Sequence, residues 1–245
     1  MPHNDAAPRD PSGAGSLPCG EGGAERLEDD SNRQAPHPHR EGAGRGAARL
    51  AILLSGRGSN MLALAEAVQT GVLQGLAEVV VVFSNDLAAP GIDSAAALGL
   101  PTDSLSSKGR KREEFDREAV AILQEYQPDY VVLAGYMRVL SPLFVRAFAG
   151  RILNIHPADT HQHQGLHAYE WAFDNRLAET KITVHLVDEG LDTGPILAQR
   201  VVNLEGADTL AEVQRRGLAV EHVLYAETLR ELIKQNSEKG NQVSC

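Results

Sequence analysis

The stretch that decides the fold is Leu50-Ala51-Ile52-Leu53-Leu54-Ser55-Gly56-Arg57-Gly58-Ser59-Asn60. Its first five residues form a short continuous apolar run, which is typical of a strand buried on both faces in a parallel sheet. A Gly-rich turn follows the run, and residues 61–68 then predict a helix. The stretch therefore predicts the strand, turn and helix that open a βαβ unit.

The same order of strand and helix recurs along the chain. Further strands are expected at 78–83, 130–134 and around Ile152, with a short extended segment near 102–103. Helices are expected around 95–97, over 112–126, from Ser141-Pro142 onward, and from about 209 to 234. Residues 182–187 and 196–202 predict a strand pair around a turn that holds Asp192. This alternation indicates an α/β, Rossmann-like fold whose mostly parallel central sheet has helices on both faces.

Composition divides the chain into three parts. Residues 1–47 are rich in Pro, Gly and charged residues and poor in large apolar ones. Such a segment buries too little apolar surface to offset its ordering entropy, so we expect a disordered N-terminal extension. Residues 48–236, about 190 residues, have the length of one domain. Residues 237–245 are expected to form a flexible C-terminal tail.

Charge, hydropathy and cysteine usage narrow the class of protein. A net charge of −10 argues against a general nucleic-acid binder. The chain shows no signal peptide core and no apolar run long enough to span a membrane. Its two cysteines, Cys19 and Cys245, lie outside the expected core and indicate neither a disulfide framework nor a Cys-metal site. We therefore expect a cytoplasmic protein with no membrane partner.

Polar and Gly-rich residues follow several of the expected strands. They are Ser55 to Asn60, Ser84-Asn85, Gly135 to Arg138, and Asn154 to His156. Ligands of open parallel sheets bind beyond the carboxyl ends of the strands. The shared position therefore predicts that these segments form one site.

Asn154-Ile155-His156-Pro157 and the later run Asp188-Glu189-Gly190-Leu191-Asp192-Thr193-Gly194-Pro195 carry the candidate chemistry. Asn154 offers an amide donor for a developing oxyanion, and His156 offers a proton carrier. Asp192 offers a carboxylate that can orient the imidazole and favour its charged form. Residues two apart on a strand face the same side, so Asn154 and His156 can address one atom. A single His after a strand is more often structural, and the combination is what indicates catalysis.

The Gly56-x-Gly58-Ser59-Asn60 turn is a phosphate cradle in principle. Glycines allow close approach of the backbone, and amides at a helix N-terminus point toward an anion. The dinucleotide fingerprint is incomplete, because Asn60 stands where its third Gly would be. A plain tight turn is the alternative interpretation.

Taken together, these runs resemble the glycinamide ribonucleotide formyltransferases, folate-dependent enzymes of de novo purine biosynthesis. The matching runs are Ser55-Gly56-x-Gly58-Ser59-Asn60, Phe83-Ser84-Asn85, Leu133 to Arg138, Leu153 to Pro157, Gly165-Leu166-His167, Thr183-Val184-His185 and residues 188–195. The resemblance covers residues 49 to 230. It implies formyl transfer from 10-formyltetrahydrofolate, the co-substrate, to the amine of glycinamide ribonucleotide. It also implies small-molecule partners, a monomer or homodimer, and no metal.

The resemblance also implies a role for each matching residue. Asn154, His156 and Asp192 would be catalytic. Gly58, Ser59 and Asn60 would hold the ribonucleotide phosphate, and Glu221 on the last helix would reach its ribose. The folate pocket would be lined by Arg112, Met137, Arg138, Val139, Leu140, Asn154, Asp188, Glu189, Gly190, Leu191 and Asp192.

One segment departs from the family pattern. After His-Pro the family usually has Ser-Leu-Leu-Pro and an aromatic-Pro-Gly, whereas this chain has Ala158-Asp159-Thr160-His161-Gln162-His163-Gln164-Gly165. Because this loop borders the reactive end of the site, the acceptor amine stays open. The alternatives are another small amine such as an amino sugar, or a non-catalytic folate- or nucleotide-binding domain. The intact Asn154, His156 and Asp192 set argues against the latter.

His156, His161, His163 and His167 lie within a dozen residues and raise the question of a zinc site. No cysteine or fixed carboxylate partner lies nearby, so we expect no metal. His161 and His163 are expected to be exposed loop residues, and His167 to cap a helix or contact substrate. His185 is expected to be a strand residue beside the site.

Overall fold

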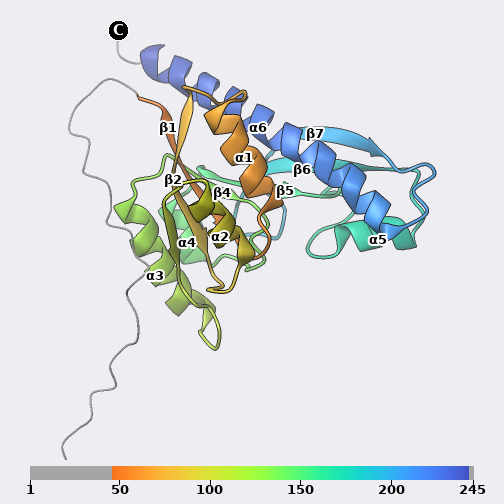
Figure 1. The fold of residues 1–245 in the computed structure, drawn as a ribbon, viewed down its shortest axis with the longest axis horizontal. Helices are drawn as coiled ribbons and strands as arrows, with labels where there is room; N and C mark the ends of the chain where they lie inside the picture. Colours follow the sequence, from red (N-terminus) through yellow and green to blue (C-terminus); the bar gives the residue numbers. More distant parts are fainter. Residues whose placement is uncertain (1–45, 243–245) are drawn as a thin grey trace, which may run out of the picture. The chain divides into compact units, whose positions relative to one another are not determined.

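The computed structural model describes residues 46–242, with side chains up to residue 239. The elements in chain order are β1 Ala48–Leu54, α1 Ser59–Gln69, β2 Ala77–Ser84, α2 Pro90–Ala97, β3 Thr102–Ser104, α3 Arg112–Glu125, β4 Tyr130–Leu133, α4 Pro142–Ala147, β5 Ile152–His156, α5 Ala168–Asp174, β6 Glu179–Leu186, β7 Ile196–Asn203 and α6 Leu210–Gln242. The described strands form one sheet (Figure 1).

The sheet has the strand order β3-β2-β1-β4-β5-β6-β7. The pairings from β3 to β5 are parallel, and those of β6 with β5 and β7 are antiparallel. The predicted α/β fold with a mostly parallel sheet is therefore confirmed. On the β5–β6 pair, Asn154 lies opposite His185 and His156 lies opposite Thr183.

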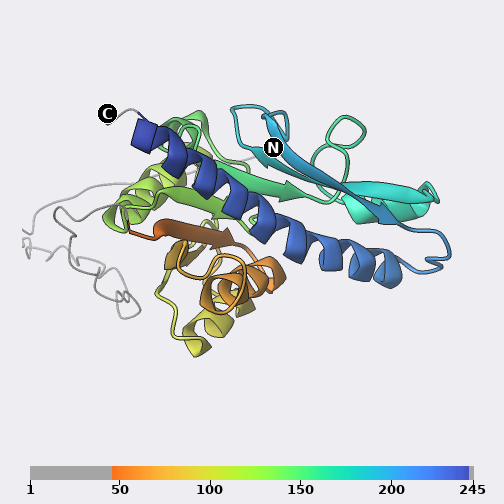
Figure 2. The same cartoon turned by 90° about the horizontal axis from the view of Figure 1, so that it is seen from above.

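Strand β1 divides the core because its side chains alternate between the two faces of the sheet. Leu50, Ile52 and Leu54 belong to a buried cluster that includes residues of α1, α2 and α6. Ala51 and Leu53 belong to the opposite cluster, with residues of α3 and α4. Figures 1 and 2 show these helices on the two sides of the sheet. The continuous apolar run in the sequence reflects burial on both faces.

Helix α6 crosses the sheet and fixes the strand ends that carry the site (Figure 2). The fully buried Tyr225 on this helix places its hydroxyl 3.1 Å from the carbonyl oxygen of Leu133 and 3.0 Å from that of Leu153. The hydroxyl can donate its single proton to either carbonyl. One side chain of α6 therefore holds the last residue of β4 and the middle of β5 together.

Helix α4 begins as the sequence predicts. Ser141 is its N-cap, with a side chain that accepts a hydrogen bond from the backbone N–H of Phe144, and Pro142 occupies the first turn. This is the usual division of roles at a helix start, because Ser satisfies a free N–H and Pro has none to lose.

Two expectations about the chain ends meet different outcomes. The last helix continues to Gln242, so its predicted end near residue 234 is wrong, and it includes residues 237–242 of the predicted C-terminal tail. Gln235, Glu238 and Lys239 are good helix formers and favour this extension. The predicted extension over residues 1–47 lies almost wholly outside the described residues, as do residues 243–245. No residue range was predicted for helix α5, although capping a helix was one of the two roles expected of His167. None of the described helices is both long and apolar enough to cross a membrane.

Candidate active site

A cleft of about 850 Å³ opens at the carboxyl edge of β1, β4 and β5. It is bordered by the loops after these strands, by the β6–β7 loop and by α6. The cleft lining includes every residue to which the resemblance gave a catalytic or binding role: Gly58, Ser59, Asn60, Arg112, Met137, Arg138, Val139, Leu140, Asn154, His156, Asp188, Glu189, Gly190, Leu191, Asp192 and Glu221. Ser84-Asn85 is the exception among the strand ends, because the Asn85 Oδ1 instead accepts a hydrogen bond from Ser55, 2.5 Å away, at the end of β1.

One end of the cleft is the N-terminus of α1. Gly58 is the N-cap in a left-handed conformation, with φ of 77°. The first N–H groups of the helix have no partners within it, so they can face an anion. Arg57, exposed at the same turn, adds a positive charge that the sequence prediction missed.

The reason for glycine at position 58 differs from the expected one. The sequence suggested that glycine there allows close approach of the backbone to a bound anion. An added Cβ would instead lie 3.2 Å from the Gly91 Cα, 3.2 Å from Leu54 Cδ2 and 3.3 Å from Met61 Cε. A side chain at this position would therefore press into the core behind the turn.

A buried polar cluster closes the wall next to this anion end. Glu221 on α6 accepts a 2.6 Å hydrogen bond from Asn60 Nδ2 and a very short one from the Tyr169 hydroxyl. Burial and the adjacent Glu221 carboxylate raise the pKa of Tyr169, so the phenol stays a donor. The Asn60 Oδ1 is buried without a partner among the described residues and is an acceptor available to a ligand. Tyr169 was missed because α5 was not predicted.

The other end of the cleft is more apolar and open. Met137 and Val139 are more than half exposed there. The Arg138 guanidinium turns away toward α3, where it lies 4.7 Å from the ring centre of Phe115 and 3.9 Å from Asp116. Glu189 forms an ion pair of 2.7 Å with Arg146. Exposed apolar side chains and the exposed guanidinium of Arg112 are thus accessible to a ligand at this end.

The β6–β7 loop is shaped by its own polar residues. The Asp188 Oδ1 accepts hydrogen bonds from Thr193 Oγ1 at 2.7 Å and from the Gly190 N–H at 3.0 Å. A Cβ added to Gly194 would collide with the carbonyl oxygen of Leu186, so only glycine fits there. This loop holds Asp192 in a left-handed conformation, with φ of 53°, that few non-glycine residues adopt.

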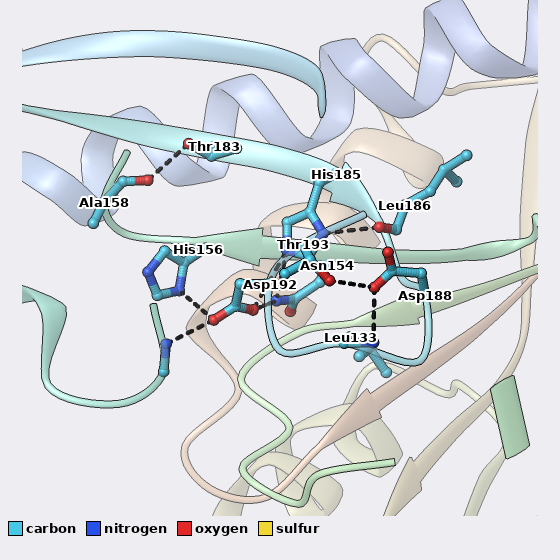
Figure 3. Close-up of polar contacts among 12 residues, drawn as sticks. Leu133, Asn154, His156, Ala158, Thr183, His185, Leu186, Asp188, Asp192 and Thr193 are labelled. Carbon is cyan, nitrogen blue, oxygen red and sulfur yellow. Dashed lines mark hydrogen bonds and ion pairs between the residues drawn. The ribbon is translucent and has the colours of Figure 1, made fainter. Parts of the chain in front are cut away.

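Asp192 is the centre of the catalytic candidates (Figure 3). Its Oδ2 accepts a 2.8 Å hydrogen bond from the Gly165 N–H and lies 3.5 Å from His156 Nδ1. Its Oδ1 lies 3.3 Å from Asn154 Nδ2 and 3.5 Å from His185 Nε2. Burial alone would raise the pKa of Asp192, but these hydrogen bonds and the nearby imidazole charges bring it below its ordinary value. The carboxylate is therefore ionised and shared by three side chains.

The amide of Asn154 already has partners in the substrate-free protein. Its Nδ2 lies 3.3 Å from Asp192 and 3.2 Å from His185 Nε2. Both distances are long for hydrogen bonds of this kind. A developing oxyanion in the cleft can therefore compete for one of these N–H groups.

His156 is almost fully buried, and both of its ring nitrogens face protein acceptors. Nδ1 faces Asp192, and Nε2 lies 3.0 Å from the carbonyl oxygen of His163. Burial lowers the pKa of His156 below its ordinary value, and Asp192 and the His163 carbonyl oppose that effect without cancelling it. The expected contribution of Asp192 is thus present, while burial, which the sequence did not reveal, sets the net direction.

The other histidines that the sequence analysis singled out lie in different environments. The prediction that His163 is an exposed loop residue is wrong, because its half-buried ring packs between His156 and Trp171. His161 is exposed, and His167 precedes α5 without a side-chain capping bond. His185 is buried on β6 beside Asp192, as expected of a strand residue next to the site. Within residues 46–242, no group of three or more His, Cys, Asp or Glu side chains is arranged to hold a metal ion.

Comparison with known proteins places this site in one family. The formyl transferase family model matches residues 48–229. The chain is 40% identical over 177 residues to the phosphoribosylglycinamide formyltransferase of Escherichia coli K12, covering 72% of this chain and 82% of that protein. It is 38% identical over 184 residues to the bovine (Bos taurus) trifunctional purine biosynthetic protein adenosine-3, of which the match covers only 18%.

A solved structure agrees with the sequence matches. The crystal structure of phosphoribosylglycinamide formyltransferase from Bacillus halodurans superposes with a TM-score of 0.72 at 40% identity, covering 76% of this chain and 95% of that chain. The family model spans the sheet from β1 to β7 and most of α6, including the cleft. The chain belongs to the formyl transferase family.

Proposed function

We propose that this protein transfers the formyl group of 10-formyltetrahydrofolate to the amine of glycinamide ribonucleotide. The observation that carries the proposal is the position of Asp192. Its carboxylate joins Asn154 and His156 in a cleft whose far end is the Gly-rich N-terminus of α1. A donor for an oxyanion, a proton carrier and an anion-binding turn thus share one cavity. Similarity to enzymes named for this reaction supports the same assignment.

The two ends of the cleft suit the two substrates. The α1 N-terminus and Arg57 would hold the ribonucleotide phosphate, with Gly58, Ser59 and Asn60 forming the turn. The unpartnered Asn60 Oδ1, fixed by Glu221 and Tyr169, would accept a hydrogen bond from a ribose hydroxyl. Arg112, residues 137–140 and the 188–192 loop would enclose the folate.

The reaction proceeds in this proposal by direct attack. The neutral amine of the acceptor attacks the formyl carbon, and the C=O electron pair moves onto the formyl oxygen. The Asn154 amide and the His156 imidazolium stabilise that charge, since preorganised donors are most effective in a buried site. A proton then passes from the former amine to N10 of the folate, the C–N10 bond breaks with its electron pair going to N10, and the new formamide forms.

Asp192 has two tasks in this scheme. Its negative charge opposes the loss of the His156 proton, and its bond to the Gly165 N–H fixes the carboxylate in place. No covalent enzyme intermediate is required, and phosphate and ribose contacts far from the formyl carbon position the amine. We further propose that residues 48–236 form the catalytic domain of a cytoplasmic monomer or homodimer that works without a metal.

The test is an acceptor assay with purified protein. 10-Formyltetrahydrofolate is mixed with glycinamide ribonucleotide, with an amino sugar, or with no acceptor, and tetrahydrofolate formation is followed. We expect turnover with glycinamide ribonucleotide, and His156→Ala should lower it by about a hundredfold or more, with little change in folate binding. Turnover only with the amino sugar would assign another acceptor. Folate binding without turnover on any amine would indicate a binding domain.

A further inference from the structure

The segment that departs from the family pattern forms a compact turn. The carbonyl oxygen of Asp159 accepts hydrogen bonds from the N–H groups of Gln162, at 2.8 Å, and His163, at 3.0 Å. The carboxylate of Asp159 accepts one from the His161 N–H at 3.1 Å. Asp159 therefore organises residues 159–163, which we call the Asp159 turn.

The sheet holds the Asp159 turn in place. Lys181 on β6 binds the Asp159 carboxylate at 2.8 Å, and Gln199 on β7 lies 3.4 Å from it. Thr183 Oγ1 donates a 2.7 Å hydrogen bond to the carbonyl oxygen of Ala158, just before the turn (Figure 3). Lys181 lowers the pKa of Asp159, so this attachment persists well below neutral pH. The turn is thus anchored on the side away from the cleft.

His163 ends the turn directly behind His156. Its ring is stacked on the His156 ring, with 6.1 Å between centroids and an angle of 11°, and it lies 4.9 Å from the Trp171 ring. Its Nδ1 is buried without a hydrogen-bond partner among the described residues. Its own carbonyl oxygen lies 3.0 Å from His156 Nε2. Ring and carbonyl of one residue therefore contact the same catalytic candidate.

This contact selects a protonation state for His156. A carbonyl oxygen accepts hydrogen bonds only, so Nε2 must carry a proton to bond it. The distance of 3.0 Å lies within the hydrogen-bond range, whereas the 3.5 Å from Nδ1 to Asp192 is at its limit. Nε2 is therefore the nitrogen that keeps its proton when the imidazolium becomes neutral.

We propose that His163 is a positioning residue for His156. Its stacked ring fixes its backbone carbonyl, and that carbonyl holds the His156 ring with a protonated Nε2. The proposal rests on the proposed function for the importance of His156, but the geometry can be tested without any substrate. The ionisable groups that face His156 are Asp192, His185 and His163 itself.

The first measurement uses the substrate-free wild-type protein with ¹⁵N-labelled histidines. NMR titration should show that His156 Nε2 stays protonated across the whole titration, while Nδ1 loses its proton as pH rises. A neutral form protonated at Nδ1 would overturn the proposal. This readout does not depend on the acceptor, so it stands apart from success or failure of the formyl transfer assay.

Three variants then test the role of the ring. His163→Ala removes the stack and should release the carbonyl, lowering kcat by roughly ten- to a hundredfold with little change in KM for the folate. His163→Phe keeps an aromatic ring and the carbonyl, so it should retain most of kcat and the Nε2 proton. Its pH profile should shift upward, because a charged His163 lowers the pKa of His156. His161→Ala, on the exposed side of the same turn, is the control and should behave as wild type.

Two outcomes would overturn this role. Wild-type kcat and an unchanged NMR spectrum of His156 in His163→Ala would show that the His163 ring does not position His156. A loss in His163→Phe as large as in His163→Ala would show that the His163 imidazole nitrogens act directly. Urea unfolding of each variant separates these results from loss of folding. If His163→Ala is unfolded, the role of His163 is tested by the tautomer of His156 in the wild-type protein and by the kcat of His163→Phe.

Discussion

Replacing Asp192 by Asn removes one negative charge from the centre of the site while keeping the shape of the side chain. The Asp192 carboxylate lies 3.5 Å from His156 Nδ1. Two unit charges at that distance interact by about 1 kcal/mol in the dielectric of water and by about 5 kcal/mol at an effective dielectric constant of 20. Even the lower figure changes the protonation equilibrium of His156 by roughly fivefold. Asp192→Asn should therefore lower the pKa of His156 further below its ordinary value.

The sign of the effect on activity follows from the charge of the active form. If the imidazolium stabilises the oxyanion, activity falls as pH rises through the pKa of His156. A lower pKa moves this loss to lower pH, so the variant should be most impaired at neutral pH and above. Below both pKa values the ring is protonated in either protein, and the difference should shrink.

The assay is NMR titration of the His156 ring together with a pH profile of turnover. Asp188→Asn is the matched control, because it makes the same charge change in the same loop. Asp188 binds Gly190 and Thr193 rather than His156. An unchanged titration midpoint for His156 in Asp192→Asn would refute the electrostatic argument. Equal shifts in the two variants would mean that the charge of the loop, and not the contact, is responsible.

Two further predictions concern stability. Gly58→Ala forces a side chain into a left-handed conformation, which costs about 1–2 kcal/mol, and into tight contact with Gly91 and Leu54. Urea unfolding should show that the free energy of unfolding falls by at least that amount. Gly56→Ala is the control and should lose less stability, because a Cβ added there meets nothing within 4 Å. Tyr225→Phe leaves the carbonyls of Leu133 and Leu153 without their shared hydrogen-bond donor. Calorimetry should then show a free energy of unfolding about 1 kcal/mol lower, or a Tm roughly 2–4 °C lower. An unchanged Tm would mean that the Tyr225 hydroxyl does not stabilise the pairing of β4 with β5.

The position of the cleft could be predicted from sequence because the segments that line it follow strands that are easy to predict. The run at residues 50–54 is buried on both faces, and the amphipathic segment from residue 112 is a helix to Glu125, close to the predicted end. Once the strands are parallel neighbours, their carboxyl ends must meet at one edge. The segments after β1, β4 and β5 therefore line one cleft without any knowledge of the loops.

The sequence alone could not predict features that depend on contacts between residues far apart in the chain. The stacking of His163 on His156 requires the Asp159 turn, and that turn depends on Lys181 and Gln199 far along the sequence. The neighbours that a side chain added at Gly58 would meet depend on how α2 packs against this turn, and no local sequence pattern reveals that packing. The net downward shift of the His156 pKa comes from burial, a property of the whole fold.

The altered loop contacts two of the catalytic candidates, Asp192 and His156. Where the family usually has an apolar, Pro-containing segment, this chain has a turn held by Asp159, and the chain after it still delivers the Gly165 N–H to Asp192 at 2.8 Å. In this chain the segment lacks the prolines of the usual family pattern, and polar contacts to β6 and β7 hold it. Elsewhere in the cleft lining, Tyr169 on α5 meets Glu221 on α6. A Cβ added at Gly217 would collide with the Tyr169 ring, so the close packing of these two helices fixes the phenol in the cleft. Substitutions at Tyr169 should consequently alter acceptor preference more than substitutions at the exposed His161.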